Sequence, residues 1–272
     1  MSTNHWLYVK VGTPGVLAAE SLLRHVVAPF MTERGYLRDG NQSKWFFLRY
    51  LDATGLHVRI RIRGRSQALQ EVDSALRNAL GRWCSHDEDR ITYVRRAVYV
   101  PEWVKWGGAE GVREAERVFA ASSRLALSLP ASCWEHRHGI ALLLMRHGIR
   151  MLPTEQRASF TYNYAWFWSG GHDPTIPSMR EAVRHGARRA AVHLACQMKL
   201  WESATGQWRN PCEAYLQALE EDLLRSKQPA HRLFNHMHLT SNRLGVSPRD
   251  EALLAEVLFL RDSSVSDLKE AA

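Results

Sequence analysis

Three arginines occupy every second position of residues 57–63, H-V-R-I-R-I-R. In an extended strand alternate side chains point to opposite faces, so Arg59, Arg61 and Arg63 share one face at a spacing of about 7 Å. Guanidiniums bind carboxylates through charge-assisted, two-pronged hydrogen bonds, so this row predicts a site for an anionic group of a substrate. The same pattern is also compatible with the solvated face of an edge strand.

A second polar segment is Y-V-P-E-W-V-K-W-G-G, residues 99–108. Glu102 and Lys105 stand there between apolar neighbours, and Gly107-Gly108 predict a tight turn into the next helix. A carboxylate and an ammonium in this setting are candidate catalytic groups. The alternative is a surface ion pair, which would contribute little to stability.

A third segment is rich in aromatic residues, with six in the nine positions 160–168. One helix cannot direct all of them into a single core. We therefore expect some of them to line a groove that binds a peptide, the candidates being Tyr162, Tyr164, Trp166 and Trp168. A cluster of aromatic rings packed between helices is the alternative.

The fourth segment is N-H-M-H-L-T-S-N-R-L-G, residues 235–245. His236 and His238 are two positions apart and do not share a helix face, which argues against a metal-binding pair. We expect one of them to be a core histidine bonded to a neighbour and the other to serve as an acid or base near neutral pH. Asn242 and Arg243, one turn further on, are candidates for substrate binding.

An α+β fold is expected to position these residues. Residues 1–107 follow the order β-α-β-β-α-β of a ferredoxin-like unit. Alternating apolar residues and the turn residues L-D-A-T-G between the second and third strands indicate where the strands lie. We expect strands at 6–11, 45–50, 57–63 and 91–100, and helices at 16–34 and from 66 onward.

From residue 108 the apolar residues recur at a helical period. The first helix, 111–129, ends at Pro130. We expect one domain over residues 1–262, in which the sheet-containing part (1–107) packs against a helical part (108–262), followed by a polar tail (263–272). Further helices are expected at 134–151, 154–168, 178–201, 211–227, 230–244 and 249–261.

The composition is that of a globular protein, with 272 residues, 45% hydrophobic and 24% charged. No apolar run approaches the ~18 residues that span a bilayer, and the N-terminus lacks the layout of a signal peptide, so a cytoplasmic location is expected. The four cysteines form no C-x-x-C pair, and no nucleotide-binding loop is present, so we expect neither metal nor cofactor. The net charge of +8 suggests an acidic partner.

Taken together, five motifs resemble the thiopeptide-type bacteriocin biosynthesis protein family, which is similar to the C-terminal elimination domain of class I lantibiotic dehydratases. They occur in the family's order from Trp6 to about Leu260. The motifs are W-F-F-L-R-Y, H-V-R-I-R, P-E-x-x-K-W-G-G, A-E-R-V-F-x-x-S-S and H-L-T-S-N-R-L-G.

The resemblance implies removal of glutamate from glutamylated Ser or Thr of a precursor peptide, which gives dehydroalanine or dehydrobutyrine. It assigns catalytic roles to Arg59, Arg61, Glu102, Lys105 and His238. The family has Arg and Tyr where this chain has Lys105 and Trp106, and lysine lacks the bidentate fork of arginine. Leader and core of the precursor are the implied partners, together with a separate glutamyl-tRNA-dependent glutamylation protein.

Two alternatives remain open. The pyridine synthases of thiopeptide pathways, on a similar scaffold, join two dehydroalanines in a formal [4+2] aza-cycloaddition and release the leader. A ferredoxin-like unit with an arginine row is also compatible with an RNA-binding module, although no RNP-like motif is present and no direct nucleic-acid partner is expected. A free sheet edge would permit a homodimer, and no membrane partner is expected.

Overall fold

The computed structural model describes residues 5–37, 44–84, 91–129, 134–170, 177–203 and 208–270. It confirms an α+β protein, which divides into two compact units. The sheet unit comprises Met1–Ala131 and Gln207–Tyr215, and the helical unit comprises Ser132–Gly206 and Leu216–Ala272. The helix that follows residue 107 therefore belongs with the sheet, whereas the sequence predicted a boundary at 107.

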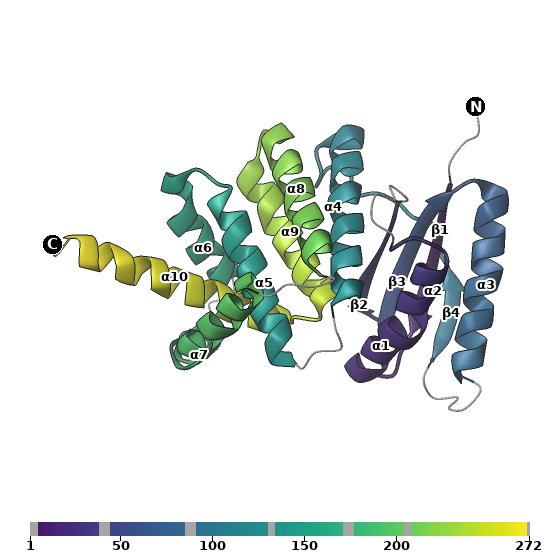
Figure 1. The fold of residues 1–272 in the computed structure, drawn as a ribbon, viewed down its shortest axis with the longest axis horizontal. Helices are drawn as coiled ribbons and strands as arrows, with labels where there is room; N and C mark the ends of the chain where they lie inside the picture. Colours follow the sequence, from purple (N-terminus) through teal and green to yellow (C-terminus); the bar gives the residue numbers. More distant parts are fainter. Residues whose placement is uncertain are drawn as a thin grey trace. The chain divides into compact units, whose positions relative to one another are not determined.

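Four antiparallel strands form one sheet in the order β2-β3-β1-β4 (Figure 1). The last strand is shorter than the predicted 91–100, because Val98 and Val100 are largely exposed and the chain leaves the sheet before Pro101. The strands are β1 (His5–Gly12), β2 (Trp45–Asp52), β3 (Gly55–Gly64) and β4 (Tyr93–Arg96).

The predicted alternation along β3 is confirmed, and its apolar side chains face the core of the sheet unit. Val58, Ile60 and Ile62 are fully buried there against helices on one face of the sheet. The helix predicted at 16–34 is continuous but contains one π-helical segment. The helices of this face are α1 (Val16–Leu22), the π-helix η1 (Leu23–Val27), α2 (Ala28–Glu33) and α3 (Ser66–Cys84).

Helix α4 (Gly108–Ser128) also packs against the sheet. Phe119 meets Phe46 of β2 edge-on, with ring centroids 5.2 Å apart. The Ser123 hydroxyl accepts a hydrogen bond of 3.2 Å from the N–H of Phe47, so α4 covers part of the edge strand β2. Gly107 adopts the left-handed conformation (φ 68°), which favours glycine at this tight turn.

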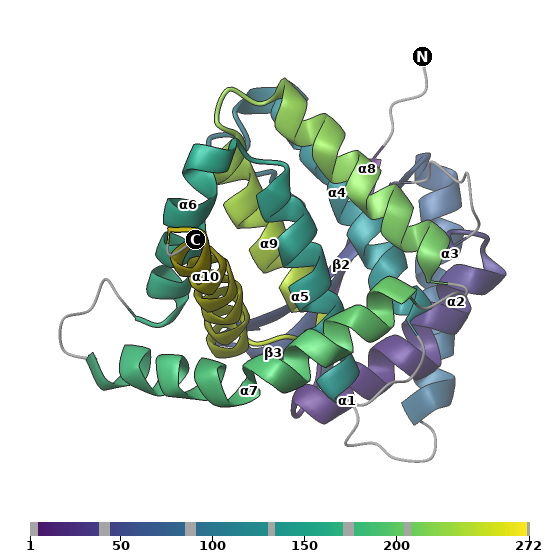
Figure 2. The ribbon, with the colours of Figure 1, turned by 60° about the vertical axis from the view of Figure 1, so that its left-hand side comes forward.

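The helical unit is built around α10, which packs against α5, α6, α7 and α9 (Figure 2). The helix α10 continues to Glu270, where the sequence predicted an end at 261 and a polar tail, because residues 262–270 contain no glycine or proline to end it. The helices are α5 (Trp134–Arg150), α6 (Thr154–Trp168), α7 (Pro177–Ser203), α9 (Pro229–Leu244) and α10 (Pro248–Glu270), together with α8 (Arg209–Arg225), which begins in the sheet unit.

Within the described ranges no helix has both the length and the apolar character that a membrane span requires. The same residues contain no group of three or more His, Cys, Asp or Glu that could hold a metal ion. Of the four cysteines, Cys133 lies outside the described residues, and the other three are free thiols.

Candidate active site

Arg59 is held by side chains of its own hairpin. Its Nε donates to Nε2 of His57 (3.0 Å), and its Nη2 donates to Oδ2 of Asp52 (3.3 Å). The guanidinium carbon lies 3.2 Å from the ring centroid of Tyr50, a cation–π contact. The positive charge of Arg59 is therefore already matched within the β2–β3 hairpin.

The carboxylate that pairs with Arg59 is stabilised by the turn. The hydroxyl and the N–H of Thr54 donate to Oδ1 of Asp52 (2.6 and 2.9 Å) and lower the pKa of Asp52 to about 2. Burial lowers the pKa of His57, whose Nδ1 donates to the carbonyl of Gly55 (3.0 Å). This leaves a neutral His57 whose Nε2 accepts from Arg59.

Arg61, two residues further on, lies in a different environment. Its side chain is 7% exposed, and its guanidinium lies 4.4, 5.2 and 5.0 Å from the ring centroids of Tyr8, Phe46 and Tyr99. Burial lowers the pKa of Arg61, but an arginine in a protein stays charged. Within the residues that the structure describes, no carboxylate pairs with this guanidinium and its Nε has no hydrogen-bond partner. A buried cation without a counterion is costly.

Below, "aromatic box" refers to Arg61 together with these three rings. Beside the box lies the buried carboxyl of Glu116 on α4, which is hydrogen-bonded to Tyr99 and 3.8 Å from Nζ of Lys44. Burial raises the pKa of Glu116 and of Tyr99, and it lowers the pKa of Lys44. Sequence reasoning missed Glu116, although a carboxyl three positions before the core residue Phe119 stands on the apolar stripe of its helix.

Glu102 and Lys105 pair with each other, at 3.6 Å between Oε2 and Nζ. The side chain of Glu102 is 66% exposed, which fits the surface ion pair offered as the alternative interpretation. Trp106, where the family has tyrosine, is buried against Phe119. Arg63 uses its backbone N–H to bond the carbonyl of residue 44, and its Nε is buried without a partner in the described part of the chain.

His238 lies on α9 in the helical unit, so it belongs to a different compact unit from Arg59, Arg61, Glu102 and Lys105. Its Nδ1 is 3.1 and 3.3 Å from the two carboxylate oxygens of Glu251 on α10. The Tyr164 hydroxyl donates to Oε2 of the same carboxylate at 2.5 Å. The imidazole is stacked on the indole of Trp168, with ring centroids 4.2 Å apart and an interplanar angle of 18°.

Glu251 is the second residue that sequence reasoning missed. It lies in the first turn of α10, where an acidic residue is usually explained by the helix dipole. Its side chain is instead completely buried, and burial raises its pKa despite the donors His238 and Tyr164.

The four aromatic residues predicted to line a groove lie in two different environments. Tyr164 is fully buried and Trp168 is half-buried, and both pack against Phe234 of α9 as an aromatic cluster between helices. Tyr162 and Trp166 are exposed on the surface of α6. Of the four predicted aromatic residues, these two are the exposed ones.

The remaining polar residues of α9 also differ in their burial. His236 is the expected core histidine, because it is 1% exposed and its Nε2 is 2.8 Å from Oδ2 of Asp222. Arg243 is also 1% exposed and donates to the carbonyl of Leu239 (3.0 Å). Its position indicates a structural role, whereas the sequence suggested substrate binding. Asn242 is partly buried.

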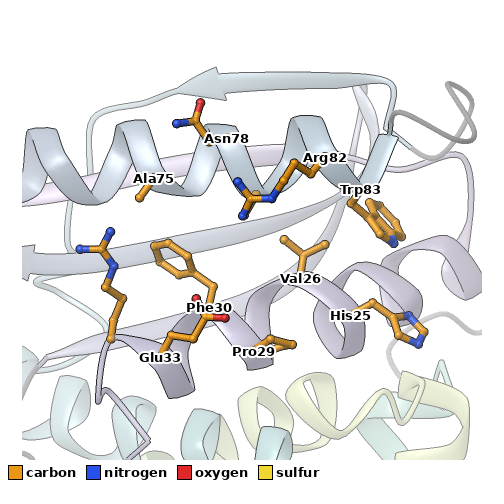
Figure 3. A pocket seen from close by; sticks show the side chains of 11 residues that line it. His25, Val26, Pro29, Phe30, Glu33, Ala75, Asn78, Arg82 and Trp83 are labelled. Carbon is orange, nitrogen blue, oxygen red and sulfur yellow. The ribbon is translucent and has the colours of Figure 1, made fainter.

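A cavity of about 460 Å³ lies in the sheet unit between η1, α2 and α3 (Figure 3). Val26 and Phe30 line it from one side and Arg82 and Trp83 from the other. None of the predicted site residues lines this cavity.

The fold and the two clusters define an α+β protein with a buried guanidinium, for which no described residue supplies a carboxylate, and with a histidine–carboxylate pair. The family model for the C-terminal part of lantibiotic biosynthesis dehydratases matches residues 6–261. The chain therefore belongs to that family, which confirms the resemblance seen in the motifs. A search of curated proteins found no match.

Three solved structures share the fold. The pyridine synthase TbtD from thiomuracin biosynthesis is 18% identical (TM-score 0.67) and is matched over 98% of this chain and 100% of its own. TsrL is 16% identical (TM-score 0.64), and the match covers 97% of this chain and 96% of the TsrL chain. MibB from Microbispora sp. 107891, a tRNA-dependent lantibiotic dehydratase, is 17% identical (TM-score 0.62). The match covers 93% of this chain and 27% of the MibB chain. The chain thus spans about a quarter of MibB.

Proposed function

We propose that this chain eliminates glutamate from glutamylated serine or threonine side chains of a precursor peptide. The observation that carries the proposal is Arg61, a buried guanidinium in an aromatic box for which the described residues provide no carboxylate. A protein that buries such a charge gains most when a ligand supplies the anion. The leaving glutamate is an anion of the required kind.

The reaction breaks two bonds and forms one double bond. A base removes the Cα proton of the modified residue, the Cα–Cβ double bond forms, and the Cβ–O bond breaks so that its electron pair leaves with the glutamate carboxylate. Arg61 binds this carboxylate and stabilises the charge that develops on it. Arg59 and Arg63 on the same face of β3 add positive potential.

We assign the proton transfer to His238. The ordinary pKa of an imidazole lies close to physiological pH, so an imidazole can both take up and release a proton.

Further roles follow from exposure. Glu102 and Lys105 are assigned to the substrate, Glu102 to the glutamyl ammonium group and Lys105 to an anionic group in place of the family's arginine. Tyr162 and Trp166 are assigned to the peptide chain because, like Phe167, they are exposed aromatic residues of α6, and Asn242 is assigned to the polar groups of the peptide.

The proposal includes the setting of the reaction. A separate glutamyl-tRNA-dependent protein would supply the glutamylated precursor, in the cytoplasm, and the chain would act as one domain over residues 1–262, as a monomer or homodimer. We also propose a ferredoxin-like classification for the sheet, supported by its β2-β3-β1-β4 order. An RNA-binding module would need an exposed arginine row, which is not what the structure has at Arg59 and Arg61.

One observation favours the second candidate, a [4+2] cyclisation that forms a pyridine ring. Asp52 already pairs with Arg59, and Glu102 already pairs with Lys105. Among the described residues of the arginine row, only Arg61 and Arg63 are then left without a salt-bridged carboxylate, where an elimination site would use several cationic groups. The likeness to the pyridine synthase TbtD over the full length of both chains points the same way.

Mass spectrometry separates the two functions. The full chain is incubated with a precursor peptide that carries a glutamate ester on one serine, and with a second peptide that carries two dehydroalanines. We expect loss of one glutamic acid from the first peptide and no change in the second. Cyclisation with release of the leader from the second peptide, and an unchanged first peptide, would replace elimination by cyclisation.

A further inference from the structure

We infer that Glu251 is a positioning residue that holds His238 in the tautomer protonated at Nδ1, so that Nε2 is the atom that receives the substrate proton. This inference rests on the proposed role of His238. Nothing in the sequence pattern suggested it, because Glu251 occupies a position where a helix-capping explanation suffices.

The first support is the geometry of the pair. Both carboxylate oxygens of Glu251 lie within hydrogen-bond distance of Nδ1 of His238, at 3.1 and 3.3 Å. A carboxylate can only accept, so the proton of the bond sits on Nδ1 and the lone pair of the neutral ring sits on Nε2. Among the described residues, none bonds Nε2.

The second support is that the rest of the site holds the ring and the carboxylate in place. The indole of Trp168 is stacked on the imidazole at 4.2 Å and fixes the plane of the ring. The Tyr164 hydroxyl donates to Oε2 of Glu251 at 2.5 Å, which stabilises the ionised carboxylate. Burial and the charge of Asp250 raise the pKa of Glu251, and the hydrogen bonds to His238 and Tyr164 act against that rise.

The third support is a contrast within the same helix. His236 also faces a carboxylate, Asp222, but both partners are 1% exposed, so a substrate has no access to that pair. In the other pair Glu251 is 0% exposed, whereas His238 keeps 27% of its side chain exposed. A buried orienting acid with a partly exposed imidazole is the arrangement that proton transfer requires.

The inference is tested without a substrate. Nitrogen-15 NMR of the histidine rings in the full chain, with His238 assigned through a His238→Asn variant, reports which nitrogen carries the proton at a pH where the ring is neutral. We expect Nδ1–H in the native protein. Nε2–H would overturn the inference, and this measurement needs no folded variant of Glu251.

Glu251→Gln should reverse the tautomer, because its amide N–H can donate to Nδ1 and so favours a proton on Nε2. The matched control is Glu256→Gln, a buried glutamate on the same helix that pairs with Arg184 (3.2 Å) rather than with His238. The inference is supported if His238 keeps its proton on Nδ1 in Glu256→Gln and carries it on Nε2 in Glu251→Gln. An unchanged tautomer in Glu251→Gln contradicts it.

Turnover then separates this inference from the proposed function. With the wrong tautomer, kcat should fall on the order of 10²–10⁴-fold while KM is retained, the loss typical of a missing acid–base group. Glu256→Gln should keep kcat. If Nδ1–H is found but His238→Asn eliminates glutamate at the native rate, the positioning stands and the catalytic role of His238 fails.

Discussion

The aromatic box around Arg61 and the cluster around His238 bury opposite charges in opposite ways. In the box a guanidinium lies against three aromatic rings, and no described carboxylate pairs with it. In the other cluster the carboxyl group of Glu251 is hydrogen-bonded to the imidazole of His238 and to the hydroxyl of Tyr164, so its polar atoms have partners inside the protein. The first cluster is therefore suited to bind an anion from outside, and the second to hold a proton-transfer group in position.

The same contrast exists within one strand. Arg59 and Arg61 share a face of β3, yet Arg59 pairs with Asp52 and Arg61 pairs with no described carboxylate. Identical residues two positions apart are thus expected to differ in their importance for substrate binding. The predictions below test these two contrasts, from the largest effect to the smallest.

Replacement of His238 should have the largest effect. His238→Asn removes the proton-transfer group and should lower kcat on the order of 10²–10⁴-fold, with glutamylated peptide accumulating. Quenched time points analysed by mass spectrometry measure the rate. Asn235→Ala, at a partly exposed residue of the same helix, is the control. A native rate in His238→Asn would remove the His238 cluster from the reaction.

Arg61→Met should come next. Loss of a group that stabilises the developing charge costs roughly 10²–10³-fold in kcat. Because methionine removes a buried unmatched charge, the free energy of unfolding should not fall. The value of kcat is measured by turnover and the free energy of unfolding by urea titration, on the same preparation. A variant with lower stability and native turnover would show that the aromatic box is structural.

Arg59→Met should have a smaller effect, about tenfold or less in kcat/KM, because Asp52 already neutralises much of this charge. The companion variant Asp52→Asn frees Arg59 and should bring its contribution closer to that of Arg61. Competition between the glutamylated peptide and free glutamate measures both. An Arg59 effect as large as the Arg61 effect would remove the distinction between the two arginines.

The smallest effect concerns the turn. The Thr54 hydrogen bonds hold the pKa of Asp52 at about 2, below its unfolded value near 4. A depressed pKa stabilises the folded state above the unfolded pKa, and this contribution is lost as the pH falls through about 2. Thr54→Val should raise the pKa of Asp52 and reduce this acid sensitivity. Carbon-13 NMR titration of the carboxyl group measures the shift, and an unchanged pKa would contradict the role of the turn.

Much of the fold could be predicted from local pattern. The helix at 154–168 has the predicted bounds, and the alternation in β3 placed its isoleucines in the core correctly. The predicted end of α10 at residue 261 was wrong. The Ser- and Asp-rich residues that follow were interpreted as a polar tail, although they contain no helix-breaking residue. Local pattern predicts elements well because backbone propensity and apolar period are properties of neighbouring residues.

The sequence by itself determined the family, the α+β class and the shared face of Arg59 and Arg61, and it predicted that one of His236 and His238 is a core histidine. Only the tertiary structure decided which charges are matched. Glu116 and Glu251 become partners of Tyr99 and His238 through packing between elements far apart in the chain. The physical reason is that the free energy of a charge depends on burial and on its neighbours in space, which residue spacing along one strand or helix does not contain.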